Sequence, residues 1–177
     1  MILLRGLHEA IDHMRIMLTG HRPGPKMNEK VVVPALMRVI TANRPCVVVS
    51  GGADGADRLW ARAAYKTKTP YEIWVPAGYY EHYNLSKEWT TPMLWAAEHV
   101  EHIGGMGAEF DVVNNFVRNV AMIETADAYV VCSHKHPIEL VKQKRGGTAH
   151  CTRELIKRRL PIIWINSETG ERENYIP

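Results

Sequence analysis

The stretch that decides the fold is residues 47–58, which read VVVSGGADGADR. A short apolar run breaks into a glycine-rich turn, and the apolar residues that follow recur at the spacing of one buried helix face. Gly51, Gly52 and Gly55 permit backbone angles at which successive N–H groups point the same way. A helix that begins here adds free N–H groups and the positive end of its dipole. The stretch therefore predicts either a cradle for phosphate or a plain tight turn in which Asp54 caps the helix.

The composition is that of an ordinary globular chain. Its 177 residues are 46% hydrophobic and 23% charged, so we expect residues 1–177 to form a single domain. The net charge of +3 suits an anionic small ligand, and the absence of an obvious basic stripe disfavours nucleic acid as a partner. Three widely spaced cysteines argue against a disulfide framework and a zinc knuckle. We predict no metal site and no cofactor.

The two ends of the chain carry separate expectations. Residues 2–14 place apolar side chains on one helical face, and this amphipathic helix either covers the edge of the core or pairs with a second copy in a homodimer. Residues 166–177 are predicted to form a polar, loosely held tail. No run is long enough to cross a membrane and no signal peptide is visible, so we expect a cytoplasmic protein without membrane contact.

Short apolar runs alternate with helical patterns along the chain. Beside the strand at 47–49, strands are predicted within 15–19 and at 71–76, 99–103, 128–132 and 160–165, and helices at 28–43, from 56, at 110–125 and after 147. Pro34 leaves two alternatives, a helix that begins near Val33 or one kinked at the proline. The alternation predicts an α/β, Rossmann-like three-layer fold with a mostly parallel central sheet and helices on both faces.

In such a sheet, ligands gather just past the carboxyl ends of the strands. Thr19, His21 and Arg22 follow the first predicted strand, and the Arg22 guanidinium suits a phosphate or carboxylate. These three residues are therefore candidates for a ligand site, the alternative being a solvated surface turn.

The predicted helix at 110–125 has two different sides. Its apolar face consists of Phe110, Val113, Val117 and Val120, and its polar strip of Asn115, Arg118 and Asn119. Such a strip is normally the solvated side. It would belong to a ligand site only if the helix leaned over the glycine turn.

Two common nucleotide signatures are absent from the sequence. Residues 51–55 do not read G-x-G-x-x-G, and no Walker lysine follows them. A dehydrogenase or a kinase is therefore disfavoured. A second glycine-rich turn at 146–148 also leads into a helix, so the chain offers two helix starts suited to an anion.

Taken together, four motifs resemble those of the SLOG superfamily, which unites DprA, the LOG phosphoribohydrolases and the YspA and YpsA proteins. The motifs are 19–23 (TGHRP), 50–57 (SGGADGAD), Arg118-Asn119 followed by Met122 and Ala126-Asp127, and 147–149 (GTA). They span residues 15 to about 165, and the match is nearest to the YspA and YpsA-like branch. The resemblance implies a Rossmann-like domain that binds nucleotides or nucleotide-derived ligands.

The motifs and the two glycine turns together place the predicted binding residues around one pocket. These are Thr19, Gly20, His21, Arg22, Ser50, Gly51, Gly52, Asp54, Gly55, Arg118, Asn119, Gly146, Gly147 and Thr148. The expected partner is a small phosphorylated nucleoside, bound by a sensor or binding module.

One departure from the LOG motif limits an enzymatic interpretation. The LOG enzymes carry a glutamate in P-G-G-x-G-T-x-x-E, and the matching position here is Cys151. Cleavage of a bond between base and ribose calls for a carboxylate near the oxocarbenium-like centre and for a base that activates water. Asp57, His150 and Glu154 are the candidate catalytic residues for the alternative function, hydrolysis of the N-glycosidic bond of a nucleoside monophosphate.

Overall fold

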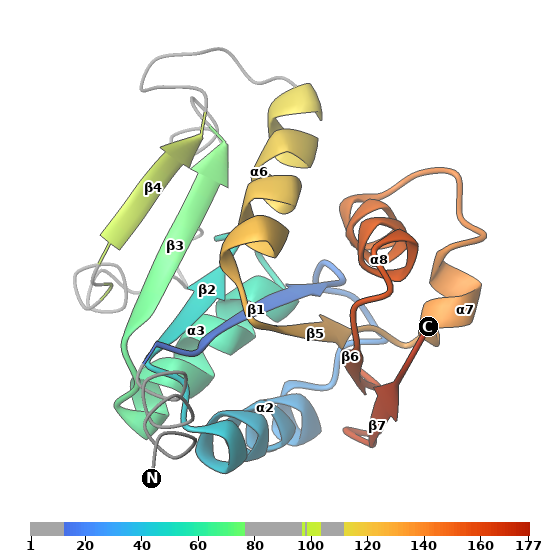
Figure 1. Ribbon diagram of the computed structural model, residues 1–177. Coiled ribbons are helices and arrows are strands. Elements are labelled where there is room, and N and C mark those ends of the chain that lie inside the picture. Colours follow the sequence, from blue (N-terminus) through green and yellow to red (C-terminus); the bar gives the residue numbers. More distant parts are fainter. Residues whose placement is uncertain (1–12, 77–96, 98, 104–111) are drawn as a thin grey trace, which may run out of the picture.

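The structure is a computed structural model that describes residues 13–76, 97, 99–103 and 112–177 (Figure 1). Nearly all of the predicted helix at 2–14 lies outside the described residues, as does Phe110. In chain order the elements are β1 (Arg15–Gly20), α2 (Glu29–Asn43), β2 (Val47–Ser50), α3 (Ala56–Thr67), β3 (Tyr71–Pro76), β4 (His99–Ile103), α6 (Val112–Thr125), β5 (Ala128–Cys132), α7 (Pro137–Leu140), α8 (Gly147–Lys157), β6 (Ile162–Ile165) and β7 (Arg172–Tyr175).

Within the described residues, seven strands form one sheet in the order β4-β3-β2-β1-β5-β6-β7. All neighbouring strands run parallel except β6 and β7. The chain order reverses at β1, from which one half of the sheet grows towards β4 and the other towards β7. A reversal of this kind separates two crossover connections and opens a crevice at the carboxyl ends of the strands.

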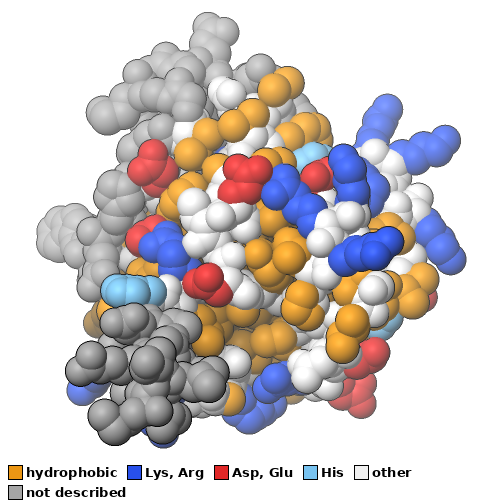
Figure 2. All heavy atoms as spheres, viewed as in Figure 1, with side chains coloured by type: hydrophobic (Ala, Val, Ile, Leu, Met, Phe, Trp, Pro, Cys, Tyr) orange, Lys and Arg blue, Asp and Glu red, His pale blue; other side chains and the backbone are white. Residues whose placement is uncertain are grey.

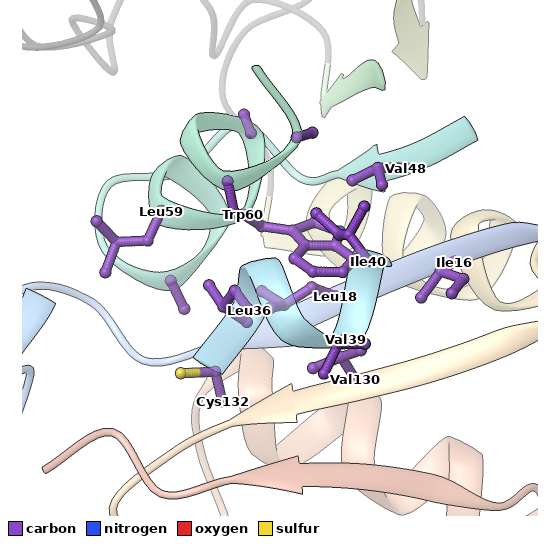
Figure 3. Packing of buried hydrophobic residues seen from close by; sticks show 14 of the residues in the cluster. Ile16, Leu18, Leu36, Val39, Ile40, Val48, Leu59, Trp60, Val130 and Cys132 are labelled. Carbon is purple, nitrogen blue, oxygen red and sulfur yellow. The ribbon is translucent and has the colours of Figure 1, made fainter. Parts of the chain in front are cut away.

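Helices cover both faces of the sheet, with α2 and α3 on one side and α6 and α8 on the other (Figure 1). Alternate residues of β1 supply the two cores, because successive side chains of a strand point to opposite faces. Leu18 belongs to the core under α2 and α3, which also contains Trp60, Leu36 and Ile40 (Figure 3). Met17 faces the core under α6 and α8. The predicted three-layer α/β fold is confirmed.

Local signals in the sequence explain how α2 begins and ends. The Asn28 side chain caps the helix by accepting the Lys30 N–H at 3.2 Å, which satisfies one of the free donors of the first turn. Arg44 ends the helix in the left-handed region, with φ of 48°, and donates its N–H to the Ile40 carbonyl. Pro34 lies inside the helix, so the alternative in which the helix begins near Val33 is wrong.

One expectation for the C-terminal third of the chain is also wrong. The loosely held tail predicted at 166–177 contains β7, which pairs antiparallel with β6 and places Asn174 opposite Ile163. The connection between β5 and α8 contains the short helix α7, which begins with Pro137 and is capped by His136. Among the described residues, no helix is both long and apolar enough to span a membrane.

Candidate functional site

The loops after β1 and β2 touch at the carboxyl edge of the sheet. The Ala56 N–H donates to the His21 carbonyl at 3.0 Å. A Cβ added to Gly55 would lie 2.8 Å from the Arg22 carbonyl carbon, and Gly55 has φ of 95°, so a side chain is excluded there by both space and backbone angle. Gly55 thus serves the packing of the two loops against each other.

The first glycine turn is occupied by the buried carboxyl group of Asp57. Its Oδ2 accepts the Ala53 N–H at 3.3 Å, and the Ser50 hydroxyl donates to the Asp57 backbone carbonyl at 2.9 Å. Ser50 Oγ also accepts the Gly52 N–H at 3.4 Å. Burial raises the pKa of Asp57, while the Arg118 guanidinium acts in the opposite direction. Two backbone amides of this turn, those of Gly52 and Ala53, are therefore engaged by the chain itself.

Helix α6 turns its polar strip inward. Arg118 and Asn119 are 7% and 6% exposed, whereas Val113 and Val117 are 57% and 48% exposed. The prediction of Val113 and Val117 as part of a buried apolar face is wrong, and the strip does lean over the glycine turn. Buried polar side chains carry a desolvation cost that must be offset by partners.

The partners of this strip join three elements. Arg118 Nη1 donates to the carbonyls of Gly51 and, at 3.0 Å, of Trp74 at the end of β3. Asn119 Nδ2 donates to the Gly147 carbonyl at 3.4 Å. The strip thereby connects the ends of β2 and β3 with the start of α8.

The start of α8 is the more open of the two glycine turns. Gly146 precedes the helix with φ of 108°, and no side chain caps the helix. A Cβ added to Gly146 would meet nothing within 4 Å. The Thr148 hydroxyl donates to the Gly20 carbonyl at 2.6 Å and so fixes this helix start against the end of β1. Within the described residues, α8 presents uncapped N–H groups beside open space, the arrangement that favours an anion.

A cavity of about 270 Å³ lies between these elements. Ten of the predicted site residues line it: Thr19, Gly20, Arg22, Gly51, Asp57, Arg118, Asn119, Gly146, Gly147 and Thr148. Burial lowers the pKa of Arg22. The nearby side chains of Asp57 and Asp54 act in the opposite direction and raise it. Two guanidinium groups and one carboxylate thus border a space suited to a negatively charged group.

A second cavity of about 490 Å³ adjoins the first. Arg22, Gly146, Gly147 and Thr148 line both cavities. His21 and His134 belong to the second one, and their Nδ1 atoms are 2.9 Å apart. Burial, assisted by the charges of His134 and Lys135, lowers the pKa of His21 to about 4.

Six predicted residues do not line either cavity: Ser50, Gly52, Asp54, Gly55, His150 and Glu154. The Glu154 carboxylate is directed to Arg158, whose Nε lies 3.8 Å from Glu154 Oε2. The His150 ring stacks on Phe116 with centroids 4.2 Å apart. Of the three candidate catalytic residues, only Asp57 is placed at a cavity.

The position that holds the LOG glutamate is occupied by a buried thiol. Cys151 is fully buried, and this burial raises the pKa of its thiol to about 12, although a hydrogen bond with Thr19 acts to lower it. A thiol in this state is neither a nucleophile nor a substitute for a carboxylate near neutral pH.

Several cavity residues were missed by sequence reasoning. Phe116 and Met122 of α6 line the first cavity, and Lys26, His134 and Gln143 line the second. Phe116 lies between the predicted faces of its helix. Lys26 and His134 each follow a strand end by a few residues, and that position is the one signal that could have identified them.

Lysine and arginine side chains gather on the side of the molecule that carries α8 and the segment before it (Figure 2). Lys142, Lys144 and Arg145 are exposed in the connection that leads to Gly146. This concentration of positive charge beside the second cavity was not predicted from the net charge, because acidic residues elsewhere in the chain balance it.

Comparison with solved structures identifies the fold. DprA from Streptococcus pneumoniae superposes with a TM-score of 0.66 at 16% identity, over 89% of this chain and 52% of that one. This chain has the same α/β fold as that DprA structure. It spans about half the length of that structure. The Rossmann-like fold that the SLOG resemblance implies is confirmed, while the nearer likeness to the YspA-like branch stays a prediction.

Two other solved structures share this fold. DprA from Helicobacter pylori, described in a single-stranded DNA binding mode, matches with a TM-score of 0.61 at 16% identity over 93% of this chain and 71% of that one. The molybdenum cofactor binding protein of Rippkaea orientalis matches with a TM-score of 0.56 at 17% identity over 87% and 77%. No protein-family model and no curated protein sequence matches the chain.

Proposed function

We propose that this protein is a binding module for a nucleotide or another nucleotide-derived phosphorylated ligand. The observation that carries the proposal is the inward polar strip of α6, which closes a cationic cavity over the uncapped start of α8. Arg118 and Asn119 are held at the cavity by hydrogen bonds to the carbonyls of Gly51, Trp74 and Gly147, and they bring a guanidinium and an amide to its wall, both of which can bind an anion.

The phosphate is proposed to lie at the second glycine turn. In the first turn, Asp57 Oδ2 accepts the Ala53 N–H and Ser50 Oγ accepts the Gly52 N–H, so a phosphate there would find these donors already engaged. At the second turn, the first N–H groups of α8 and the Arg22 guanidinium border the same space. Helix N–H groups and an arginine together are a common anion site.

The comparisons support ligand binding without choosing the ligand. One neighbour with this fold is described with single-stranded DNA and another with a molybdenum cofactor. The small volume of the first cavity, about 270 Å³, favours a small molecule over a polymer for this chain.

The alternative, hydrolysis of an N-glycosidic bond, has weaker support. Glu154 pairs with Arg158, His150 stacks on Phe116, and the glutamate position holds a buried thiol. Of the three candidate catalytic residues only Asp57 lines a cavity, whereas this chemistry needs both a stabilising carboxylate and a group that activates water.

The test is to incubate the protein with a panel of nucleoside monophosphates and related compounds, and to record thermal shift and released base together. We expect a shift without base release, and release of base would establish the hydrolase instead. Arg22→Ala should weaken binding at least tenfold, whereas Arg38→Ala, an exposed arginine of α2, removes the same charge and should leave binding unchanged. If no compound shifts the melting temperature, the nucleotide pocket is refuted.

A further inference from the structure

The two cavities share a wall, and that wall is the proposed phosphate site. Arg22 and the Gly146–Thr148 turn border both spaces, of about 270 and 490 Å³. Together the cavities fall within the range of about 300–1,000 Å³ that is usual for small-molecule sites. A group bound at the shared wall therefore has room for a substituent on each side.

On this basis we infer that the ligand carries its phosphate in the middle, bonded to organic groups on both sides, as in a phosphodiester or a pyrophosphate-linked compound. This inference rests on the proposed function and extends it. A phosphate monoester placed at the same wall would fill one cavity and leave the other to water. Apolar contact and displaced water would then be lost on the empty side.

The first cavity is equipped for a polar, hydroxyl-bearing half of the ligand. Asn115 and Asn119 of α6 and the Asp57 carboxyl group line it, and these side chains offer both donors and acceptors. Because hydroxyl groups both donate and accept, a sugar matches this mixture better than an apolar group does.

The second cavity is equipped for a flat heterocycle. The rings of His21 and His134 border it, with ring centroids 4.6 Å apart, beside Gly24 and Pro25. The low pKa of His21 keeps its ring uncharged near neutral pH. An uncharged aromatic ring can stack on a heterocycle while its nitrogens donate or accept a hydrogen bond. Lys26 adds a positive charge to the same wall.

The experiment compares four adenine ligands by isothermal titration calorimetry: AMP, ADP, ADP-ribose and adenylyl-adenosine. ADP-ribose has a pyrophosphate between two organic groups, and adenylyl-adenosine has a phosphodiester. We expect at least one of these two to bind at least tenfold more tightly than both AMP and ADP, and the tighter of the pair identifies the linkage.

A variant that fills the second cavity tests the placement. A side chain at Gly24 enters open space, so Gly24→Phe is expected to fold. It should reduce the affinity for the tighter doubly substituted ligand at least tenfold, whereas Arg38→Phe on the exposed side of α2 should not. Thermal unfolding of both variants confirms that they fold.

The outcomes separate this inference from the proposed function. If AMP binds as tightly as both doubly substituted ligands, the inference is wrong and the proposed function stands. If Gly24→Phe folds and the affinity is unchanged, the second cavity holds no part of the ligand and the inference is equally wrong. If none of the four ligands binds, both proposals fail.

Discussion

The Thr148 hydroxyl donates a hydrogen bond of 2.6 Å to the carbonyl of Gly20. This bond joins the first turn of α8 to the last residue of β1, two residues that are 128 positions apart in the sequence. A side chain at Gly20 would lie 2.6 Å from the Cys132 carbonyl oxygen, so glycine is required where the end of β1 pairs with β5. The bond therefore connects the second glycine turn to the central strand of the sheet, and it holds open the space between them.

Thr148→Val should lower the free energy of unfolding by about 1–2 kcal/mol, because the substitution leaves a partly buried carbonyl without its donor. Urea unfolding measures the change. Thr125→Val is the matched control, since the Thr125 hydroxyl bonds within its own exposed helix turn and its removal should cost less than about 0.5 kcal/mol. Equal effects of the two substitutions would contradict a special role for the Thr148 bond.

Gly51→Ala should destabilise the protein by about 1–3 kcal/mol, because the new Cβ would clash with the Arg118 guanidinium and lie 2.5 Å from Asp57 Oδ2. Gly24→Ala adds the same methyl group to open space and should change stability by less than about 0.5 kcal/mol. Thermal unfolding of the two variants at equal concentration provides the comparison. A Gly51→Ala protein as stable as the parent would show that Arg118 is not held against this turn.

The pH dependence of stability should carry a contribution from His21. Its pKa is about 4 in the folded protein and near 6.5 when unfolded, so the folded state binds this proton less tightly. The contribution is complete above pH 6.5 and is lost as the pH falls towards 4. Glutamine does not titrate, so His21→Gln is the reference. The free energy of unfolding of the parent protein should fall relative to that of His21→Gln as the pH drops from 6.5 to about 4, and the difference between the two should be constant above pH 7.

The cause of this shift can be tested with a second variant. His134→Gln removes one of the positive charges that lower the pKa of His21, so the His21 ring should titrate at a higher pH in an NMR experiment. An unchanged titration would leave burial and the Lys135 charge as the causes of the shift.

The three thiols should differ in reactivity in the native protein. Cys132 and Cys151 are fully buried with pKa values raised to about 12, while Cys46 is half-buried. A thiol-specific reagent near neutral pH should therefore label Cys46 first, and the other two after unfolding. Mass spectrometry of the labelled peptides measures the order, and early labelling of Cys151 would contradict its burial against Thr19.

The central part of the fold could be predicted because its strands are short apolar runs and its helices bury one face. Val47–Ser50 and Ala128–Cys132 are buried on both sides of a parallel sheet, and such strands are apolar throughout. Arg172–Tyr175 was missed because an edge strand that is mostly exposed needs no apolar residues. The pairing of β7 with β6 depends on a contact that leaves no local signal.

The sequence could predict where the candidate site lies better than it could predict its details. The ends of the strands indicated Thr19, Arg22 and Gly51, and these residues line one cavity because the carboxyl ends of parallel strands lie at one edge of the sheet. The direction of α6 could not be obtained from its periodicity, because Val117 and Arg118 are adjacent in the sequence and either side of the helix could face inward. Tertiary packing determines which side faces inward, and in this protein it is the polar side.

The Asp57 side chain shows that a glycine-rich turn in front of a helix is not always open to a ligand. Its Oδ2 accepts the Ala53 N–H, and burial of this carboxyl group raises its pKa. The two glycine turns of this chain have similar sequences and differ in what they offer a ligand, because a side chain of the protein itself fills the first of them.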